Sequence, residues 1–428
     1  MERTVDVTIE SMAFRGNGVA RVDGKVVFVP RVVKGETARV EIVKEKKDYC
    51  IGTATQITVP SPFRVTPLCP YFSLCGGCQW QHIDYQAQVE FKKEILEETI
   101  RRFARPREVP PVTVYPSPLA YGYRVRVQLK GNRGRIGYYE ERSHRIIPID
   151  HCPIAHPLIN QIIRLLQESP SLFSSVNEIE VNVSPEEGRG ILILHPFDSA
   201  PGMERDIADF LRRHSLLKGV AVVRKGRLDL LGETDLAFTV SFQKKGDPKE
   251  VRLRTSPQSF FQIHPEQNQK LIQTVIDYGA LEQGERVLDL YAGIGNFTIP
   301  IASTTPDVTG IEESRTSVMD ARNNARANGV GGCRFIRGRV EDVLKSGRVE
   351  KPDVILLDPP RLGCKEIVPY VLDLAPKRIV YVSCDPTTFS RDLGLFGKSG
   401  YTLERLTLID LFPQTYHMEV VGLLLPGC

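Results

Sequence analysis

The sequence has no run of 18 or more apolar residues, and charged side chains interrupt its first twenty positions. Neither a membrane span nor a secretory signal is therefore expected. It also has no internal repeat and no low-complexity segment, and its 41% hydrophobic and 25% charged residues are typical of globular proteins. These absences exclude fibrous, disordered and membrane-spanning classes, and we expect a cytoplasmic protein. Its 428 residues suffice for about three modules.

Cysteine is scarce, but four of the nine cysteines form a pattern. An odd number in a reducing compartment disfavours disulfide bonds. The spacing C-x5-C-x2-C with one distant cysteine offers four thiolates, which suit either tetrahedral zinc or an iron-sulfur cluster. The spacing alone leaves both open, with free structural thiols as a third interpretation. The four candidate metal ligands are Cys69, Cys75, Cys78 and Cys152.

The net charge of +4 is small but unevenly distributed. Residues 101–145 contain eleven Lys and Arg against three acids, together with six aromatic residues. Basic groups displace phosphate counterions and aromatic faces stack on bases, which favours RNA as a partner. A solvated basic face over an aromatic core is equally consistent with this stretch. No feature implies a protein partner, and we expect a monomer.

The N-terminal half predicts two modules. Short alternating strands punctuated by glycines fill residues 1–57 and predict a small OB-type β-barrel, which commonly binds oligonucleotides or, alternatively, is purely structural. Residues 58–250 predict an α+β module that begins with a Pro-rich linker. A helix over 85–105, expected to pack on the C-terminal domain, carries one apolar face. That face comprises Val89, Leu96, Ile100 and Phe103.

Residues 251–428 predict an α/β domain, because strands alternate with helices there. The last two strands follow each other without a helix between them, which is typical of a Rossmann-like sheet finished by an antiparallel edge. The seven predicted strands span 286–291, 308–312, 333–338, 353–358, 378–383, 404–412 and 418–425.

A glycine loop after the first of these strands predicts a nucleotide-type cofactor. Gly293 and Gly295 allow close backbone approach, and Glu312, nineteen residues past Gly293, can hold ribose hydroxyls. Thr298 stands where a dinucleotide fingerprint needs its third glycine. Asp289 suits the ammonium group of S-adenosylmethionine and would repel a pyrophosphate. The loop therefore favours S-adenosylmethionine over NAD.

The fourth strand ends in Asp358-Pro-Pro-Arg361, which places a carboxylate beside the reactive methyl group. In methyltransferases that modify amino groups, the residue after the prolines is usually aromatic. Because Arg361 stands there, methylation of an amino nitrogen is disfavoured.

Cys384 ends the fifth strand, where ligands bind in open α/β sheets. A thiolate that adds to carbon 6 of uracil places electron density on carbon 5, which can then attack a sulfonium methyl. The remaining proton on carbon 5 requires a base, and Glu419 at the start of the last strand could reach the same edge. Cytosine-5 enzymes of RNA carry a second cysteine directly after the fourth-strand proline, whereas Cys364 lies four residues beyond Pro360. Uracil is therefore preferred.

The chain resembles the RNA uracil-5 methyltransferases in the motifs SFFQIHP (259–265), DLYAGIGNF (289–297), GIE (310–312), LLDPPRLG (356–363), VSCDP (382–386) and HMEVV (417–421). The resemblance implies Cys384 as nucleophile and Glu419 as proton acceptor. It also implies an N-terminal TRAM domain that binds RNA. The pocket residues that it implies are Gln262, Tyr291, Asn296, Glu312 and Asp358.

One branch of this family holds a [4Fe-4S] cluster with the same cysteine spacing, including CGGC and a distant HCPI. The resemblance thus favours an iron-sulfur cluster over zinc. That branch mostly modifies 23S ribosomal RNA, and similar proteins act on the T-loop of tRNA. Where relatives often contact adenine through Asn or Asp, this chain aligns Arg339, with Asp342 three positions on. A catalytically silent RNA-binding protein is the alternative of a different class.

Overall fold

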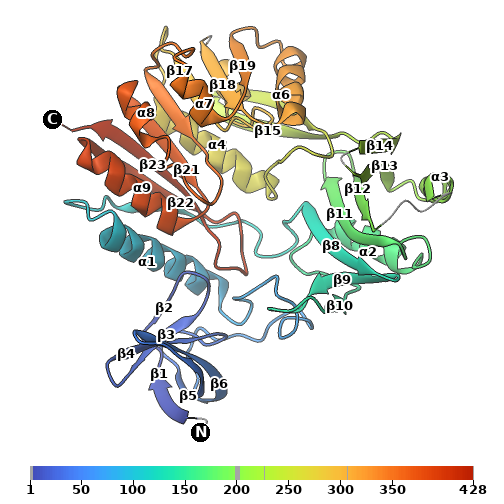
Figure 1. Cartoon of the computed structure of the whole chain (residues 1–428), viewed down its shortest axis with the longest axis vertical. Coiled ribbons are helices and arrows are strands. Elements are labelled where there is room, and N and C mark those ends of the chain that lie inside the picture. Colours follow the sequence, from blue (N-terminus) through green and yellow to red (C-terminus); the bar gives the residue numbers. More distant parts are fainter. Residues whose placement is uncertain (1–2, 198–202, 226, 306, 428) are drawn as a thin grey trace.

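The computed structural model describes residues 3–197, 203–225, 227–305 and 307–427 (Figure 1). The N-terminal strands lie at one end, the C-terminal α/β domain lies at the other, and the central module lies to one side. Within the described residues, no helix is long and apolar enough to cross a membrane.

The N-terminal module is a six-stranded sheet in the order β1-β5-β6-β4-β3-β2. β1 also contacts β3, so the sheet curls towards closure. Its alternating residues bury one apolar face, which includes Val27, Val29 and Val40. The strands are β1 (Arg3–Thr8), β2 (Ser11–Met12), β3 (Gly18–Val22), β4 (Lys25–Val29), β5 (Thr37–Glu45) and β6 (Tyr49–Val59).

The central module is a seven-stranded sheet in the order β10-β9-β8-β11-β12-β13-β14, with α2 (Pro157–Gln167) and α3 (Met203–Arg213) packed on it. α2 forms because His156 caps it, Pro157 opens it, and Ile159, Ile163 and Leu166 recur on one buried face. Its strands are β8 (Arg126–Asn132), β9 (Arg135–Tyr139), β10 (Ile146–Pro148), β11 (Val176–Ser184), β12 (Arg189–Pro196), β13 (Leu217–Arg224) and β14 (Arg227–Gly232).

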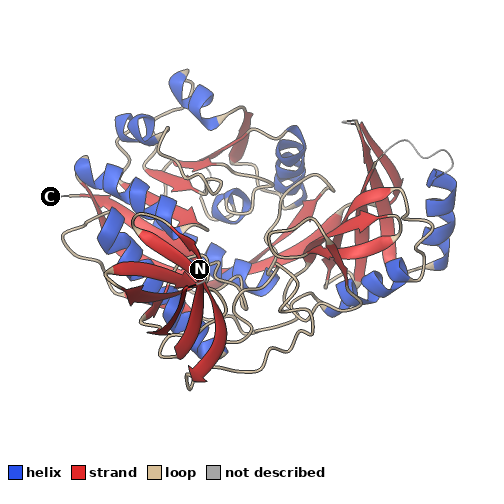
Figure 2. Ribbon diagram, turned by 60° about the horizontal axis from the view of Figure 1, so that its bottom comes forward, coloured by secondary structure: helices blue, strands red, loops and turns tan. Residues whose placement is uncertain are grey.

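The C-terminal domain is built on an eight-stranded sheet in the order β19-β18-β17-β20-β21-β23-β22-β7. Only β23 runs antiparallel to its neighbours. Its strands are β17 (Val287–Leu290), β18 (Val308–Glu312), β19 (Cys333–Arg337), β20 (Val354–Leu357), β21 (Arg378–Ser383), β22 (Tyr401–Ile409), β23 (Glu419–Pro426) and β7 (Val112–Tyr115). Figure 2 shows helices on both faces of this sheet: α4 (Pro265–Gly279), α5 (Thr298–Ala302), α6 (Arg315–Ala327), α7 (Val340–Lys345), α8 (Val368–Asp373) and α9 (Pro386–Lys398).

The seven expected strands are all present, and β7 is an eighth that the sequence did not suggest. It pairs in parallel with β22 at the sheet edge. Its four residues lie between Pro111 and Pro116, which read as loop residues, but an edge strand tolerates prolines at its ends. α1 (Tyr85–Phe103) begins at the cap Asp84 and packs against α9. Phe103, expected on its buried face, is 48% exposed at the helix end.

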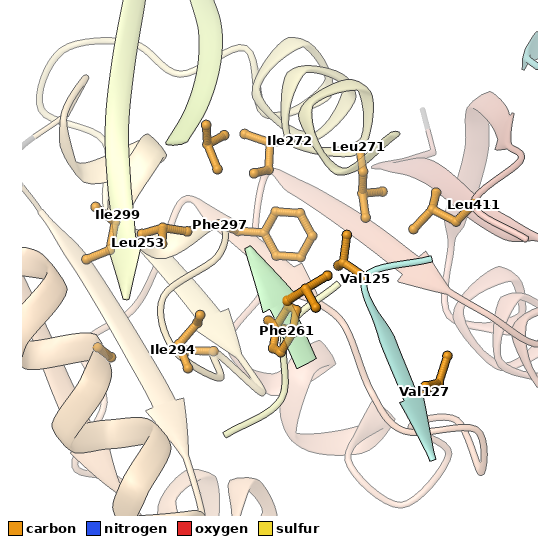
Figure 3. Close-up of a cluster of buried hydrophobic side chains, with 14 of the residues drawn as sticks. Val125, Val127, Leu253, Phe261, Leu271, Ile272, Ile294, Phe297, Ile299 and Leu411 are labelled. Carbon is orange, nitrogen blue, oxygen red and sulfur yellow. The ribbon is translucent and has the colours of Figure 1, made fainter. Parts of the chain in front are cut away.

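The hairpin of β15 (Leu236–Lys244) and β16 (Asp247–Thr255) packs on α4 and α6. The module boundary expected at residue 250 therefore falls inside β16. One apolar cluster joins the central module to the C-terminal domain (Figure 3). In it, Val125 beside β8 and Leu253 of β16 meet Ile294 and Phe297 of the glycine loop. Both modules thus support that loop.

Candidate active site

Cys384 and Glu419 lie opposite each other at the carboxyl edge of the sheet. The antiparallel pairing of β21 with β23 ends with Ser383 against Val420. Cys384 follows Ser383 and Glu419 precedes Val420, so both lie just past this last pair, and the charge of Glu419 acts on the pKa of Cys384. Glu419 is 3% exposed and Cys384 is half-buried. A thiol and a carboxyl group therefore share one protected site.

Asp358 and Arg361 bring opposite charges to this site. Asp358 directly follows β20, whose Leu357 pairs with Tyr381 of β21, three residues before Cys384. Burial raises the pKa of the Cys384 thiol to about 12, and Glu419 and Asp358 add to the rise. Arg361, whose guanidinium lies near the sulfur, lowers that pKa. Arg361 is therefore the group that favours the thiolate.

Both carboxyl groups of the site hold their protons more tightly than usual. Burial raises the pKa of Asp358 to about 7. Burial also raises the pKa of Glu419 well above its usual range, with Asp358 adding to the rise and Arg361 opposing it. Such mutually perturbed groups in a shared site are typical of catalysis.

The glycine loop leads from β17 to α5 and bends sharply. Tyr291 has φ 70° and Gly293 has φ 55°. Gly295 has φ 88°, and a Cβ there would come within 2.7 Å of Ile299. Glu312, at the end of β18, accepts hydrogen bonds from the Gly293 amide (3.0 Å) and the Ser314 amide (2.7 Å). The carboxylate is therefore fixed beside the loop, with lone pairs left for a ligand.

Asp289 is fully buried under this loop. Its Oδ2 accepts a hydrogen bond from Thr298 Oγ1 at 2.5 Å, while its Oδ1 has no partner. Burial raises the pKa of Asp289 to about 7, and the charges of Asp358 and Glu312 add to the rise. Asp289, Glu312 and Asp358 thus form an acidic set, which a cationic ligand would stabilise.

Two neighbouring side chains that the sequence did not single out hold the expected pocket residues. Asn296 exchanges two hydrogen bonds with Asn268 of α4, at 2.8 and 3.0 Å. Gln262 is half-buried in the segment between β16 and α4. Asp320 of α6 fixes that segment by accepting three hydrogen bonds from Ser256 and Ser259, at 2.6–2.9 Å. Isolated Asn and Asp residues on helices carry no local signal for such roles.

The loop from Asp410 to Met418, which leads into Glu419, is anchored by buried polar groups on α1. Lys92 donates to Asp410 Oδ1 at 2.7 Å and to the Phe412 carbonyl at 3.1 Å, and both charged side chains are fully buried. Gln88 and Gln414 exchange two hydrogen bonds. Lys92 lies three residues after Val89 and four before Leu96, on the apolar face of α1. A lysine on an apolar helix face is the sequence signal that could have predicted a buried ion pair here.

The four cysteines expected to bind a metal line one cavity of about 330 Å³. Burial is the main reason that the pKa of Cys78 rises to about 12, and the other three thiols add to the rise. In the described part of the chain, only Glu178, Glu180 and His195 form a group of three possible ligand atoms within 4.8 Å. The four cysteines therefore line one cavity, but no three of their sulfur atoms lie within 4.8 Å of one another. Arg361, Phe412 and His417 line the same cavity.

Arg339 and Asp342 are exposed at the start of α7. Arg339 occupies the position before the first turn without a capping hydrogen bond from its side chain, and its Nε lies 3.7 Å from a carboxylate oxygen of Glu341. The charges of Glu341 and Arg339 also act on the pKa of Tyr291, so this helix start lies beside the glycine loop.

The basic stretch is partly neutralised within the molecule. Arg126 pairs with Glu180 at 2.6 Å, Lys130 pairs with Glu178, and Arg145 pairs with Glu140. The first two pairs also place cations on the carboxylates beside His195. The high local charge of residues 101–145 therefore overstates what is left for an external partner.

Comparison with known proteins decides the family. Residues 84–426 match the family described as tRNA (Uracil-5-)-methyltransferase, and residues 2–55 match the TRAM domain. The chain belongs to the tRNA (uracil-5-)-methyltransferase family. Membership confirms the predictions of an RNA uracil-5-methyltransferase with a Rossmann-like catalytic domain and an N-terminal TRAM domain.

Similar family members align along almost the whole chain. The 23S rRNA (uracil(1939)-C(5))-methyltransferase RlmD of Pectobacterium atrosepticum is 32% identical over 431 residues, which cover 99% of this chain and 94% of that protein. An uncharacterized RNA methyltransferase of Aquifex aeolicus is 33% identical over 427 residues, 99% of each chain. Among solved structures, the Pyrococcus abyssi tRNA (uracil-54, C5)-methyltransferase in complex with S-adenosyl-L-homocysteine has a TM-score of 0.77 and 25% identity, and covers 98% of this chain and 99% of that one.

Proposed function

We propose that this uracil-5-methyltransferase transfers a methyl group from S-adenosylmethionine to carbon 5 of a uridine in 23S ribosomal RNA, and that it acts in the cytoplasm. The observation that carries the chemistry is that Cys384 and Glu419 meet at one sheet edge, with the Arg361 guanidinium near the sulfur. A nucleophile and a base in hydrogen-bonding range of one substrate ring suit covalent catalysis. The 32% identity to RlmD supports ribosomal RNA as the substrate.

The residues would act in a fixed order. The Cys384 thiolate, stabilised by Arg361, bonds to carbon 6 of uracil, and carbon 5 gains electron density. Carbon 5 then takes the methyl group, and the sulfonium becomes a neutral thioether. Glu419 accepts the remaining proton from carbon 5, the bond to Cys384 breaks, and 5-methyluridine leaves. Asp358, beside Cys384, would hydrogen-bond the uracil edge while it carries a proton.

The methyl donor fits the acidic set. S-adenosylmethionine carries an ammonium and a sulfonium, and the unpartnered Oδ1 of Asp289 is a buried acceptor suited to a cation. Glu312 is fixed where ribose hydroxyls would be held, with Tyr291, Asn296 and Gln262 around the same loop. The S-adenosyl-L-homocysteine complex of the Pyrococcus abyssi enzyme supports this assignment.

Replacing Glu419 with Gln tests the mechanism. Attachment precedes proton removal, so the E419Q variant should accumulate a covalent protein–RNA adduct that is stable on denaturing gels. The control C384A should form neither adduct nor 5-methyluridine. Turnover by E419Q at the wild-type rate would contradict the role of Glu419.

The RNA substrate is tested separately. Mass spectrometry should compare 23S rRNA and tRNA from cells with and without the protein. In cells that lack the protein, 5-methyluridine should be missing at one position of 23S rRNA and retained in tRNA. Loss from the T-loop of tRNA would instead assign the chain to the activity named for its structural relative from Pyrococcus abyssi.

We further propose that Cys69, Cys75, Cys78 and Cys152 hold a [4Fe-4S] cluster. Tetrahedral zinc, with Zn–S bonds near 2.3 Å, would bring sulfurs to about 3.8 Å from one another. The wider spread of these sulfurs around one cavity of about 330 Å³ fits a larger cluster better. The cluster would tie the segment after the TRAM domain to the central module.

Anaerobic purification tests this assignment. About four irons and no zinc per chain are expected, as is characteristic of a cubane cluster. C78S should lose the iron, whereas C333S, which changes a half-buried cysteine on β19 outside this cavity, should keep it. One zinc per chain would contradict the proposal.

A further inference from the structure

Leu362 is a large apolar residue that the fold holds in solvent beside the nucleophile. It is 80% exposed, more than any other large hydrophobic residue in the described ranges. It directly follows Arg361, whose guanidinium lies near the Cys384 sulfur and lowers the pKa of that thiol. Single exposed leucines are common on protein surfaces. The position of this one, one residue from a group at the reacting atom, points to a contact with the substrate.

Side chains of α9 fix the backbone that carries Leu362. Arg391 Nη2 donates to the Leu362 carbonyl at 2.8 Å, and Thr388 Oγ1 donates to the Arg361 carbonyl at 3.2 Å. α9 begins at Pro386, two residues after Cys384. The leucine is therefore positioned by the same helix that follows the nucleophile.

Hydrogen bonds also fix the turn from Pro360 to Gly363, which contains Leu362. Gly363 has φ +74°, and a Cβ there would collide with the carboxylate of Asp392 and the guanidinium of Arg391. The Gly363 amide donates to the Pro360 carbonyl at 2.8 Å, and the buried Asp392 accepts the Cys364 amide at 2.7 Å. Such a rigid turn keeps Leu362 out of the core, and the residue adds little to folding because so little of it is buried.

The chemistry explains why a rigid apolar group is useful here. Cys384 is half-buried at a strand end, so carbon 6 of a stacked uracil cannot reach the sulfur unless the base leaves its stack. The departing base exposes the face of its neighbour. Leucine is among the apolar side chains that proteins insert between bases.

We propose that Leu362 is the wedge of this enzyme. It packs on the nucleobase next to the target uridine, fills the vacated stacking position, and so holds the uracil in the pocket of Cys384 and Asp358. This assignment rests on the proposed function and adds a residue that the enzyme needs for stacked targets and not for unstacked ones.

The test compares two RNAs with one target uridine. One is a 23S rRNA hairpin that contains the uridine mapped by mass spectrometry, and the other is a linear single strand of the same sequence. Unstacking is needed mainly for the hairpin, so L362A should lower the hairpin-to-single-strand ratio of kcat/KM about tenfold or more. L362M, which retains an apolar wedge, should restore the ratio. A 2-aminopurine beside the target should brighten when wild-type protein binds the hairpin, and much less with L362A.

The control is L230A, which removes a leucine that is 55% exposed on β14, and it should leave the ratio unchanged. An unchanged ratio in L362A, or an equal loss on both RNAs, would overturn the wedge while leaving the methyltransferase assignment intact. A wild-type enzyme that methylates neither RNA would overturn the proposed function itself.

Discussion

Two regions behind the same sheet edge bury charged groups, and they treat those groups differently. In the support network, which comprises Tyr85, Gln88, Lys92, Asp410 and Gln414, every buried charge has an opposite charge and further hydrogen bonds. In the acidic set of Asp289, Glu312 and Asp358, burial and the charges of the other two groups raise the pKa of Asp289, and Asp289 Oδ1 has no partner. The first region is complete without a ligand, whereas the second is stabilised by one.

The difference separates support from function. A satisfied ion pair fixes the loop that carries Glu419, so its loss should affect folding. A buried acid with an unpartnered oxygen, such as Asp289, costs folding energy in the free protein and is stabilised by a cation that binds there. Substitutions in the two regions should therefore change stability in opposite directions.

The largest change in stability is expected from a substitution in the support network. D410A would leave Lys92 buried without its counter-charge, which typically costs about 3–5 kcal/mol of unfolding free energy. The measurement is urea denaturation followed by circular dichroism. E97A, which removes an exposed pair with Arg101 on the same helix, is the matched control and should change stability by less than about 0.5 kcal/mol. Equal losses in the two variants would show that the buried pair does not support the fold.

The reaction should depend strongly on pH. Because burial and acidic neighbours raise the pKa of Cys384 to about 12 and that of Glu419 well above its usual range, the reactive deprotonated forms are scarce at neutral pH. For each proton that must leave, kcat/KM should rise about tenfold per pH unit below the relevant pKa. Arg361 lowers the pKa of both Cys384 and Glu419, and the R361Q variant lacks this cation. The increase of kcat/KM with pH should therefore occur at higher pH in R361Q than in the wild type. A flat profile between pH 6 and 9 would contradict these assignments.

The places of the proposed catalytic residues in the fold could be predicted from the sequence, whereas the support network could not. Asp358 and Cys384 directly follow the apolar parallel strands β20 and β21, whose carboxyl ends meet at one edge of the sheet. Glu419 begins the antiparallel strand β23, so the start of that strand lies at the same edge. Lys92 and Asp410 lie 318 residues apart, and their pairing depends on how α1 docks. β7 was hidden by its flanking prolines, and Asn268 and Asp320 sit on helices where nothing local marks their partners.

A substitution in the acidic set should change stability by less, and it should increase the unfolding free energy instead of lowering it. The pKa of Asp289 is about 7 in the folded protein against an ordinary 3.8, so the folded state binds the proton more tightly. Stability linked to this group is therefore present below about pH 4, and it falls as pH rises to 7. D289N removes that cost and retains an acceptor for Thr298, so its unfolding free energy at pH 8 should be higher by up to a few kcal/mol.

The same variant should bind the cofactor less well. Asparagine offers no charge to the ammonium group, and a charged hydrogen bond contributes about 1.5–3 kcal/mol, so the affinity for S-adenosylhomocysteine in calorimetry should fall about 10- to 100-fold. N182A, which changes a buried residue of β11 whose Oδ1 also has no partner, controls for the loss of a buried polar atom and should leave cofactor affinity unchanged. If D289N gained stability and still bound the cofactor as tightly as the wild type, the acidic set would be a burden on folding with no role in binding. Higher stability together with weaker binding is what distinguishes a ligand site from the paired support behind it.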